Sequence, residues 1–187
     1  MINKKNKIFS FLDDYLEIFG FFLFLIISTI ILYNRHFYDD EIFNIYFIKK
    51  YDFFSLFALF NSFDVHPPLS YMINSFFYLI FKDFKMAIFP ILLLNSYALY
   101  FFFKNYRRKI TDPYELILVY LFTFLNPQIL MWTNSLRWYA VWTPLFIIVY
   151  TLILICQKNK YTYLKSIMLF TIMLYLNYIM VFSVMIM

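Results

Sequence analysis

The chain has 187 residues, of which 64% are hydrophobic, 26% are aromatic and only 14% are charged, and its mean hydropathy is +0.70. A water-soluble domain of this length cannot bury so much apolar surface, so the composition predicts a protein whose solvent is mostly lipid. The net charge of +5 comes from basic residues in short segments between apolar runs. That distribution favours a role in membrane topology over nucleic-acid binding.

The first apolar run covers residues 16–33 and follows Lys4, Lys5 and Lys7. Its flanks resemble those of a signal peptide, but the run is too long and lacks a small-residue cleavage site. A helix needs about 20 apolar residues to cross a bilayer. We therefore expect an uncleaved first transmembrane helix, with the N-terminus in the cytoplasm.

Residues 34–67 form the predicted extracytoplasmic loop after this helix. The loop begins with the acidic cluster Asp39-Asp40-Glu41 and continues as a stretch rich in Ile, Phe, Leu and Tyr. Such a stretch is typical of interfacial helices that lie along a membrane surface. Asp39 or Asp40 could cap one of these helices. Capping does not account for three successive acids beside lipid, and carboxylates in such a place indicate function.

The loop ends with Asp64-Val65-His66-Pro67-Pro68, where an acid and an imidazole precede a rigid step. Proline cannot continue a helix interior, so Pro67 and Pro68 are predicted to fix where the chain enters the membrane. His66 either contacts a ligand or caps the following helix. Asp64 either fixes the tautomer of His66 or is solvated.

Residues 68–187 contain the further membrane helices that we predict. The run at 68–81 is short, and the longer runs, each near the length of one crossing, are 86–103, 114–132, 138–156 and 163–187. The pattern predicts an all-α polytopic bundle of about five to six transmembrane helices. Asparagines within these runs are expected to form interhelical hydrogen bonds; they are Asn74, Asn95, Asn126 and Asn177.

Basic residues gather at the N-terminus, at 104–109 and at 158–165. The positive-inside tendency places all three groups in the cytoplasm, which requires the run at 68–81 to lie in the interface or to dip and return. Strict alternation of crossings would instead place 104–109 outside. The first loop is extracytoplasmic in both topologies, and residues 134–138 face the same side in the charge-based one.

A third polar element, Ser135-Leu136-Arg137-Trp138-Tyr139, separates two apolar runs. Its arginine has two interpretations. Arg137 either binds an anion, or it is an interfacial anchor within a belt of aromatic side chains.

These three elements, taken in order, resemble the membrane glycosyltransferases of the GT-C fold, in the dolichyl-phosphate-mannose protein mannosyltransferase-like superfamily. The resemblance is carried by the acidic pair after the first helix, by the His-Pro-Pro-Leu element, and by Arg137 with Tyr139 two positions later. Trp142 stands where the O-mannosyltransferases have an aspartate, so the bacterial branch acting on lipids, glycans or proteins is more similar.

The resemblance implies transfer of a sugar from a polyprenyl-phosphate donor to a glycan, lipid or protein acceptor, on the extracytoplasmic face of the inner or plasma membrane. Such a reaction needs a carboxylate for the acceptor's proton and a cation for the leaving phosphate. The resemblance implies Asp40 as general base, Glu41 as a residue that orients the acceptor, and Asp39 as the alternate base. Arg137 suits the phosphate, because a guanidinium is always charged and binds in a bidentate manner. The residues implied in further donor binding are His66 and Tyr139, and those in support are Asp64, Pro67 and Pro68.

No cofactor is expected, because similar enzymes work without a metal. The alternative is a Mg²⁺ or Mn²⁺ site with oxygen-rich ligands, drawn from His36, Asp39, Asp40, Glu41, Asp64 and His66. The resemblance also implies that residues 1–187 are the N-terminal part of a GT-C module, apparently truncated and possessing little activity alone. The alternative function is a non-enzymatic polytopic protein, such as a transporter fragment or an assembly subunit.

Overall fold

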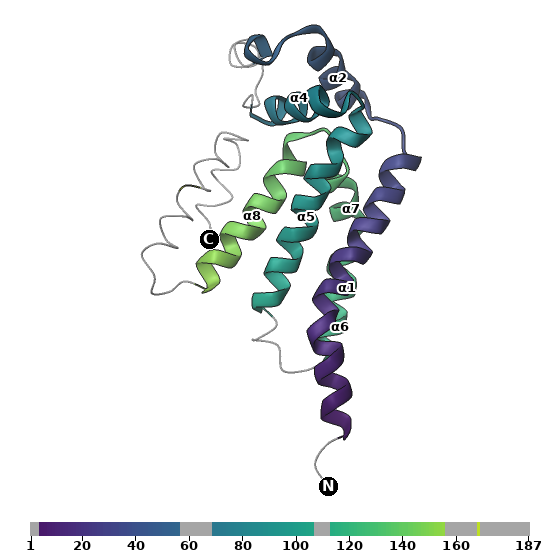
Figure 1. Cartoon of the computed structure of the whole chain (residues 1–187), viewed down its shortest axis with the longest axis vertical. Helices are drawn as coiled ribbons and strands as arrows, with labels where there is room; N and C mark the ends of the chain where they lie inside the picture. The colour runs from purple at the N-terminus through teal and green to yellow at the C-terminus, as the bar shows by residue number, and fades with distance from the viewer. Residues whose placement is uncertain (1–3, 57–68, 107–112, 156–167, 169–187) are drawn as a thin grey trace.

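The computed structural model in Figure 1 describes residues 4–56, 69–106, 113–155 and 168. Helices account for nearly all of these residues, and no strand occurs among them. The all-α class predicted from the sequence is therefore confirmed for this part of the chain. The helices are α1 (Lys4–Asn34), α2 (Asp39–Lys50), α4 (Leu69–Phe81), α5 (Phe84–Tyr106), α6 (Pro113–Phe124), α7 (Pro127–Thr133) and α8 (Trp138–Ile155).

Two of the described helices are long and apolar enough to cross a membrane: residues 15–34 of α1, with a mean hydropathy of 2.3, and α5, with 1.8. On α1 the side chains of Phe19, Ile26 and Ile30 are 55% to 62% exposed. An apolar face of this extent fits a lipid environment better than water. The five to six crossings predicted from the sequence are not confirmed, because the described ranges contain two helices that meet the criteria.

The helices form a bundle with a cap across one end (Figure 1). α1 and α5 pack side by side and run in opposite directions, and α8 also packs against α5. α2 and α4 lie across the end of the bundle at which α5 begins, whereas the start of α1 and the end of α5 lie at the opposite end. α4 therefore forms no further helix alongside α1 and α5, and this is the arrangement that the charge-based topology requires.

The apolar run at 114–132, predicted as one crossing, is two short helices. α6 ends at Phe124 and α7 begins at Pro127. Proline has no N–H group, so Pro127 suits the first position of a helix and cannot continue the preceding one. Asn126 caps α7, because its Oδ1 accepts a hydrogen bond from the Ile129 backbone N at 3.3 Å. The expectation of one uninterrupted helix is thereby corrected.

A polar contact between α5 and α8 compensates for a proline. Pro144 lies inside α8, and because it has no N–H, the carbonyl of Ala140 lacks its usual helical donor. Asn95 of α5 donates from Nδ2 to this carbonyl at 2.9 Å and to the Ile91 carbonyl at 2.9 Å. Backbone groups in lipid must be satisfied by the protein itself. The interhelical hydrogen bond predicted for Asn95 is thus confirmed, and it makes Pro144 tolerable.

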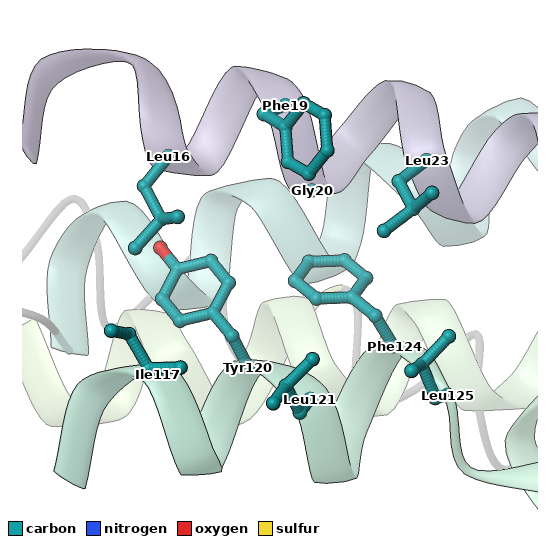
Figure 2. Close-up of a pocket in the computed structure, with 9 residues that line it drawn as sticks. All are labelled: Leu16, Phe19, Gly20, Leu23, Ile117, Tyr120, Leu121, Phe124 and Leu125. Carbon is teal, nitrogen blue, oxygen red and sulfur yellow. The ribbon is translucent and has the colours of Figure 1, made fainter. Parts of the chain in front are cut away.

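The chain's single glycine lies where α1 meets α6 (Figure 2). A Cβ atom built on Gly20 would lie 2.7 Å from Cε2 and 2.8 Å from Cζ of Phe124. The two helices approach this closely only because residue 20 has no side chain. A small cavity of about 90 Å³ beside the contact has an apolar lining, formed by Leu16, Phe19, Gly20, Leu23, Ile117, Tyr120, Leu121, Phe124 and Leu125.

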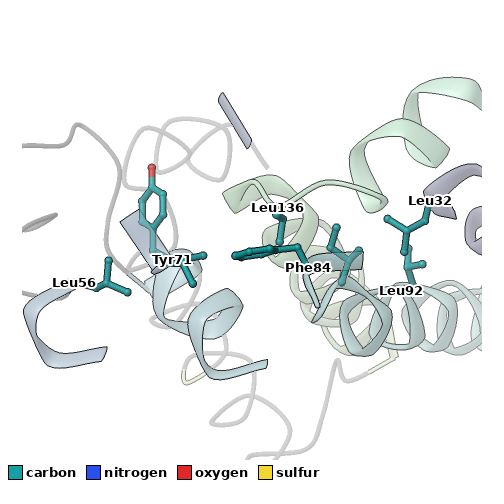
Figure 3. Packing of buried hydrophobic residues seen from close by; sticks show 8 residues of the cluster. Leu32, Leu56, Tyr71, Phe84, Leu92 and Leu136 are labelled. Carbon is teal, nitrogen blue, oxygen red and sulfur yellow. The ribbon is translucent and has the colours of Figure 1, made fainter. Parts of the chain in front are cut away.

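A hydrophobic cluster joins the cap to the bundle (Figure 3). Leu32 near the end of α1, Phe84 at the start of α5 and Leu136 before α8 belong to it, together with Tyr71 of α4. Leu136 is 1% exposed. The segment before α8 is therefore anchored beneath α2 and α4.

Replacing Asn95 by Leu should lower the free energy of unfolding by about 1 kcal/mol, because the Ala140 carbonyl loses its donor. In a Pro144→Ala background the backbone N–H of position 144 restores that donor, so the same replacement should cost less. Reversible unfolding in SDS, run as a double-mutant cycle, measures the coupling. Equal costs in both backgrounds would contradict the compensation.

Gly20→Ala should destabilise the chain by about 1–3 kcal/mol, because the new methyl group overlaps the Phe124 ring. In a Phe124→Leu background the ring is absent, and the added cost of Gly20→Ala should shrink. The same unfolding assay measures both. A cost that does not depend on the residue at 124 would show that α1 and α6 are not in contact at this point.

Candidate active site

The acidic cluster forms the first turn of α2. Tyr38 is the N-cap residue, and Asp39, Asp40 and Glu41 are the first three helical positions. Neither Asp39 nor Asp40 is therefore the N-cap residue of α2, which was the alternative role predicted for them. Glu41 accepts a hydrogen bond from the Tyr38 backbone N at 2.9 Å. Negative side chains at this end of α2 are favoured by the helix dipole.

Glu41 is fully buried although it is a carboxylate. Its Oε2 lies 2.7 Å from Nη1 of Arg35, and its Oε1 lies 2.7 Å from Nη2. Oε1 also accepts a hydrogen bond from the Leu136 backbone N at 2.7 Å. Both carboxylate oxygens are thus engaged by the protein itself. The contacts of Glu41 are therefore structural, and its predicted role in orienting the acceptor stays a prediction.

Arg35 is the site residue that sequence reasoning missed. Its side chain is 13% exposed, and besides Glu41 it donates to the carbonyl of Asn134 and to that of His36. Its guanidinium also lies 5.5 Å from the ring centroids of Phe37 and Tyr38. A buried carboxylate needs a nearby cation, and Arg35 is the arginine or lysine closest to Glu41 in the chain. That rule could have found it.

The loop at residues 134–137, which we call the α7–α8 loop, is fixed by side chains from three places. Arg35 and Glu41 bind its backbone as described, and Asn44 of α2 and Asn74 of α4 donate to the Leu136 carbonyl at 2.9 Å and 3.1 Å. Both asparagines are buried. The hydrogen bond predicted for Asn74 is found, although its partner is this loop rather than another helix. The backbone next to Arg137 is therefore held firmly.

Asp40 and Arg137, far apart in the sequence, form an ion pair at this loop. Their side chains are 68% and 30% exposed, respectively. The Arg137 guanidinium lies 5.7 Å from the ring centroid of Tyr139, and the Tyr139 ring lies 5.8 Å from that of Trp132. Nε of Arg137 is buried and has no hydrogen-bond partner among the described residues. The arrangement places an accessible carboxylate beside a partly exposed cation.

Of the other candidate residues, the structure describes Asp39 and His36, and neither is a partner in this ion pair. Asp39 and His36 are exposed. Within the described ranges no three His, Cys, Asp or Glu side chains gather as a metal site would require. The predicted residues Asp64, His66, Pro67 and Pro68 lie outside the described residues.

Two side chains with shifted pKa values lie at the end of α2 and just beyond it. Lys50 donates to the Tyr46 hydroxyl at 3.1 Å, and this hydrogen bond raises the pKa of Lys50 above its usual value. The Ser55 hydroxyl donates to Asp52 at 2.6 Å and lowers the pKa of that carboxyl. Both groups are thus favoured in their charged forms near neutral pH. With acids in its first turn and lysines in its last, α2 complements its own dipole.

Comparison of the chain with protein families, with curated proteins and with solved structures finds no match.

Removing the Glu41 carboxylate should be among the most destabilising changes in this region. Glu41→Ala leaves the buried Arg35 charge unpaired, for which about 3–5 kcal/mol is expected. The double variant Arg35→Ala/Glu41→Ala should cost less than the sum of the two single changes. SDS unfolding measures all three, with Glu115→Ala at an exposed position of α6 as a control expected within about 0.5 kcal/mol of wild type. Additive costs would show that the two side chains do not stabilise each other.

Proposed function

We propose that the chain carries the active site of a membrane-embedded glycosyltransferase of the GT-C type. The enzyme would take a sugar, a hexose or a pentose, from a polyprenyl-phosphate carrier and transfer it to a glycan, lipid or protein acceptor. The protein would be multi-pass in the inner or plasma membrane, with its N-terminus in the cytoplasm and the site on the opposite face. The observation that carries the proposal is the meeting of Asp40 and Arg137 beside the cap of the bundle.

Asp40 is the proposed general base. It is the more accessible partner of the ion pair, at 68% exposed, whereas neighbouring Glu41 is fully buried. An acceptor hydroxyl must lose its proton as it attacks the anomeric carbon, and a positioned carboxylate can take that proton. Among the three acids of the first turn, Asp40 is the one that the structure pairs with Arg137. This distinguishes it from Asp39, the alternate base.

Arg137 is the proposed phosphate-binding group. The leaving group of the reaction is a lipid phosphate, whose charge grows as the sugar departs, and a fixed cation lowers the energy of that state. Arg137 belongs to the α7–α8 loop, whose backbone is bound by Arg35, Glu41 and Asn44. A rigid support of this kind is what precise placement of a catalytic cation requires. Tyr139 packs against the same guanidinium.

A second function fits the same contacts. The ion pair could be a latch between α2 and the α7–α8 loop in a non-enzymatic subunit. A non-enzymatic subunit transfers no sugar, so in this second function Asp40 has no catalytic role, and as part of an exposed ion pair it contributes little to stability. Activity measurements on Asp40 variants therefore separate the two functions.

Asp40→Asn should reduce sugar transfer by about 10²- to 10⁴-fold, because the amide cannot accept the acceptor's proton. The measurement is transfer of radiolabel from polyprenyl-phosphate hexoses and pentoses to acceptors in a membrane extract. Glu115→Gln, an equivalent change of an exposed acid in the first turn of α6, should keep full activity.

Full transfer by Asp40→Asn would rule out Asp40 as the base, and loss confined to Asp39→Asn would move that role to Asp39. Absence of transfer by the wild-type chain from every donor would favour the non-enzymatic subunit.

A further inference from the structure

The Asp40–Arg137 ion pair spans the space that the proposed reaction needs. In a displacement with inversion, the acceptor attacks one side of the anomeric carbon and the phosphate leaves from the other. The base and the phosphate-binding cation must then be separated by a sugar. In the structure Asp40 and Arg137 are in direct contact. The ion pair therefore has to open before a donor can be bound productively.

The neighbouring ion pair shows which contact can open. Arg35 and Glu41 are 13% and 0% exposed, whereas Arg137 and Asp40 are 30% and 68% exposed. Breaking a buried pair leaves an unsolvated charge, which is strongly unfavourable, while an exposed pair contributes little. The Asp40–Arg137 pair can thus separate while the backbone beneath Arg137 stays bound to Glu41 and Asn44.

Arg137 also has the capacity to prefer a phosphate. Its side chain is 30% exposed, and its Nη2 is the atom that contacts Asp40. A guanidinium presents its N–H groups in a planar fork that matches two phosphate oxygens at once. A phosphate that displaces Asp40 can therefore bind the guanidinium through two N–H groups, whereas Asp40 contacts it through Nη2.

We infer that Arg137 is exchanged between Asp40 and the phosphate of the carrier. Binding of the phosphate takes the guanidinium from Asp40 and frees the carboxylate for the acceptor. This inference rests on the proposed function and adds to it a resting state in which the base and the cation neutralise each other.

The exchange also balances charge through the reaction. The acceptor's proton passes to Asp40, a bond forms between the acceptor oxygen and the anomeric carbon, and the bond from that carbon to the phosphate oxygen breaks. The electron pair of the broken bond stays on the phosphate. Asp40 loses one negative charge as the phosphate gains one. Arg137 therefore has a charged partner before the step and after it.

The test is a binding measurement on the whole chain in nanodiscs of neutral lipid, with a polyprenyl monophosphate as ligand. Asp40→Asn removes the internal competitor, so the Kd should fall by about two- to five-fold, the range expected for loss of an exposed ion pair. Asp39→Asn removes the same charge one residue away, outside the ion pair, and should change the Kd less. Arg137→Ala should weaken binding in either background. Asp40→Ser repeats the test, and circular dichroism checks that each variant is folded.

The outcomes separate this inference from the proposed function. Wild-type binding that Asp40→Asn leaves unchanged or weakens would overturn the exchange while leaving Arg137 as a phosphate-binding residue. Equal tightening by Asp39→Asn would reduce the effect to general charge and also overturn it. If no variant binds the polyprenyl phosphate, the exchange and the proposed function both fail. If Asp40→Asn lowers the Kd for inorganic phosphate but not for polyprenyl phosphate, the site binds a soluble anion, and this result would contradict exchange with a lipid carrier.

Discussion

The buried carboxylate of Glu41 is the constraint on which the rest of the candidate site depends. It binds Arg35 at the end of α1, the backbone at the start of α2 and the backbone N of Leu136 before α8. A carboxylate without exposure to water is tolerated only when its partners are complete, and here they come from segments far apart in the chain. The same contacts that satisfy this charge therefore bring α2 and the α7–α8 loop together.

Adjacent acids divide two tasks because a helix turns by about 100° per residue. Glu41 points into the protein and Asp40 points outward, so one carboxylate supports the site and the other is accessible to it. The support extends to a polar network in an otherwise apolar bundle, with Asn44 and Asn74 on the Leu136 carbonyl and Asn95 on the Ala140 carbonyl. Each of these amides meets a backbone carbonyl at or near the start of α8. α8 is thus held by side chains from α2, α4 and α5.

Composition and apolar spacing were sufficient to predict helices and the interhelical hydrogen bond of Asn95. Both partners of the Asp40–Arg137 pair were singled out through the resemblance to the GT-C glycosyltransferases, because composition alone left Arg137 as a possible interfacial anchor. Composition and spacing could not show which acid is buried, since Asp39, Asp40 and Glu41 look alike until the start of α2 is known. Arg35 was missed because a basic residue at the end of an apolar run has an ordinary explanation as an anchor. The break before Pro127 was missed because long apolar segments flank it on both sides, although Asn126-Pro127 is a dipeptide typical of turns.

The central claim is that a lipid phosphate binds where Asp40 and Arg137 meet. Photolabelling of the chain in nanodiscs with a benzophenone-bearing polyprenyl phosphate, followed by mass spectrometry of the labelled peptides, tests this claim most directly. The account predicts that label is concentrated in peptides containing the first turn of α2 and the α7–α8 loop, that unlabelled polyprenyl phosphate competes with it, and that Arg137→Ala removes it. Competable labelling confined to the apolar cavity between α1 and α6, and unaffected by Arg137→Ala, would contradict it.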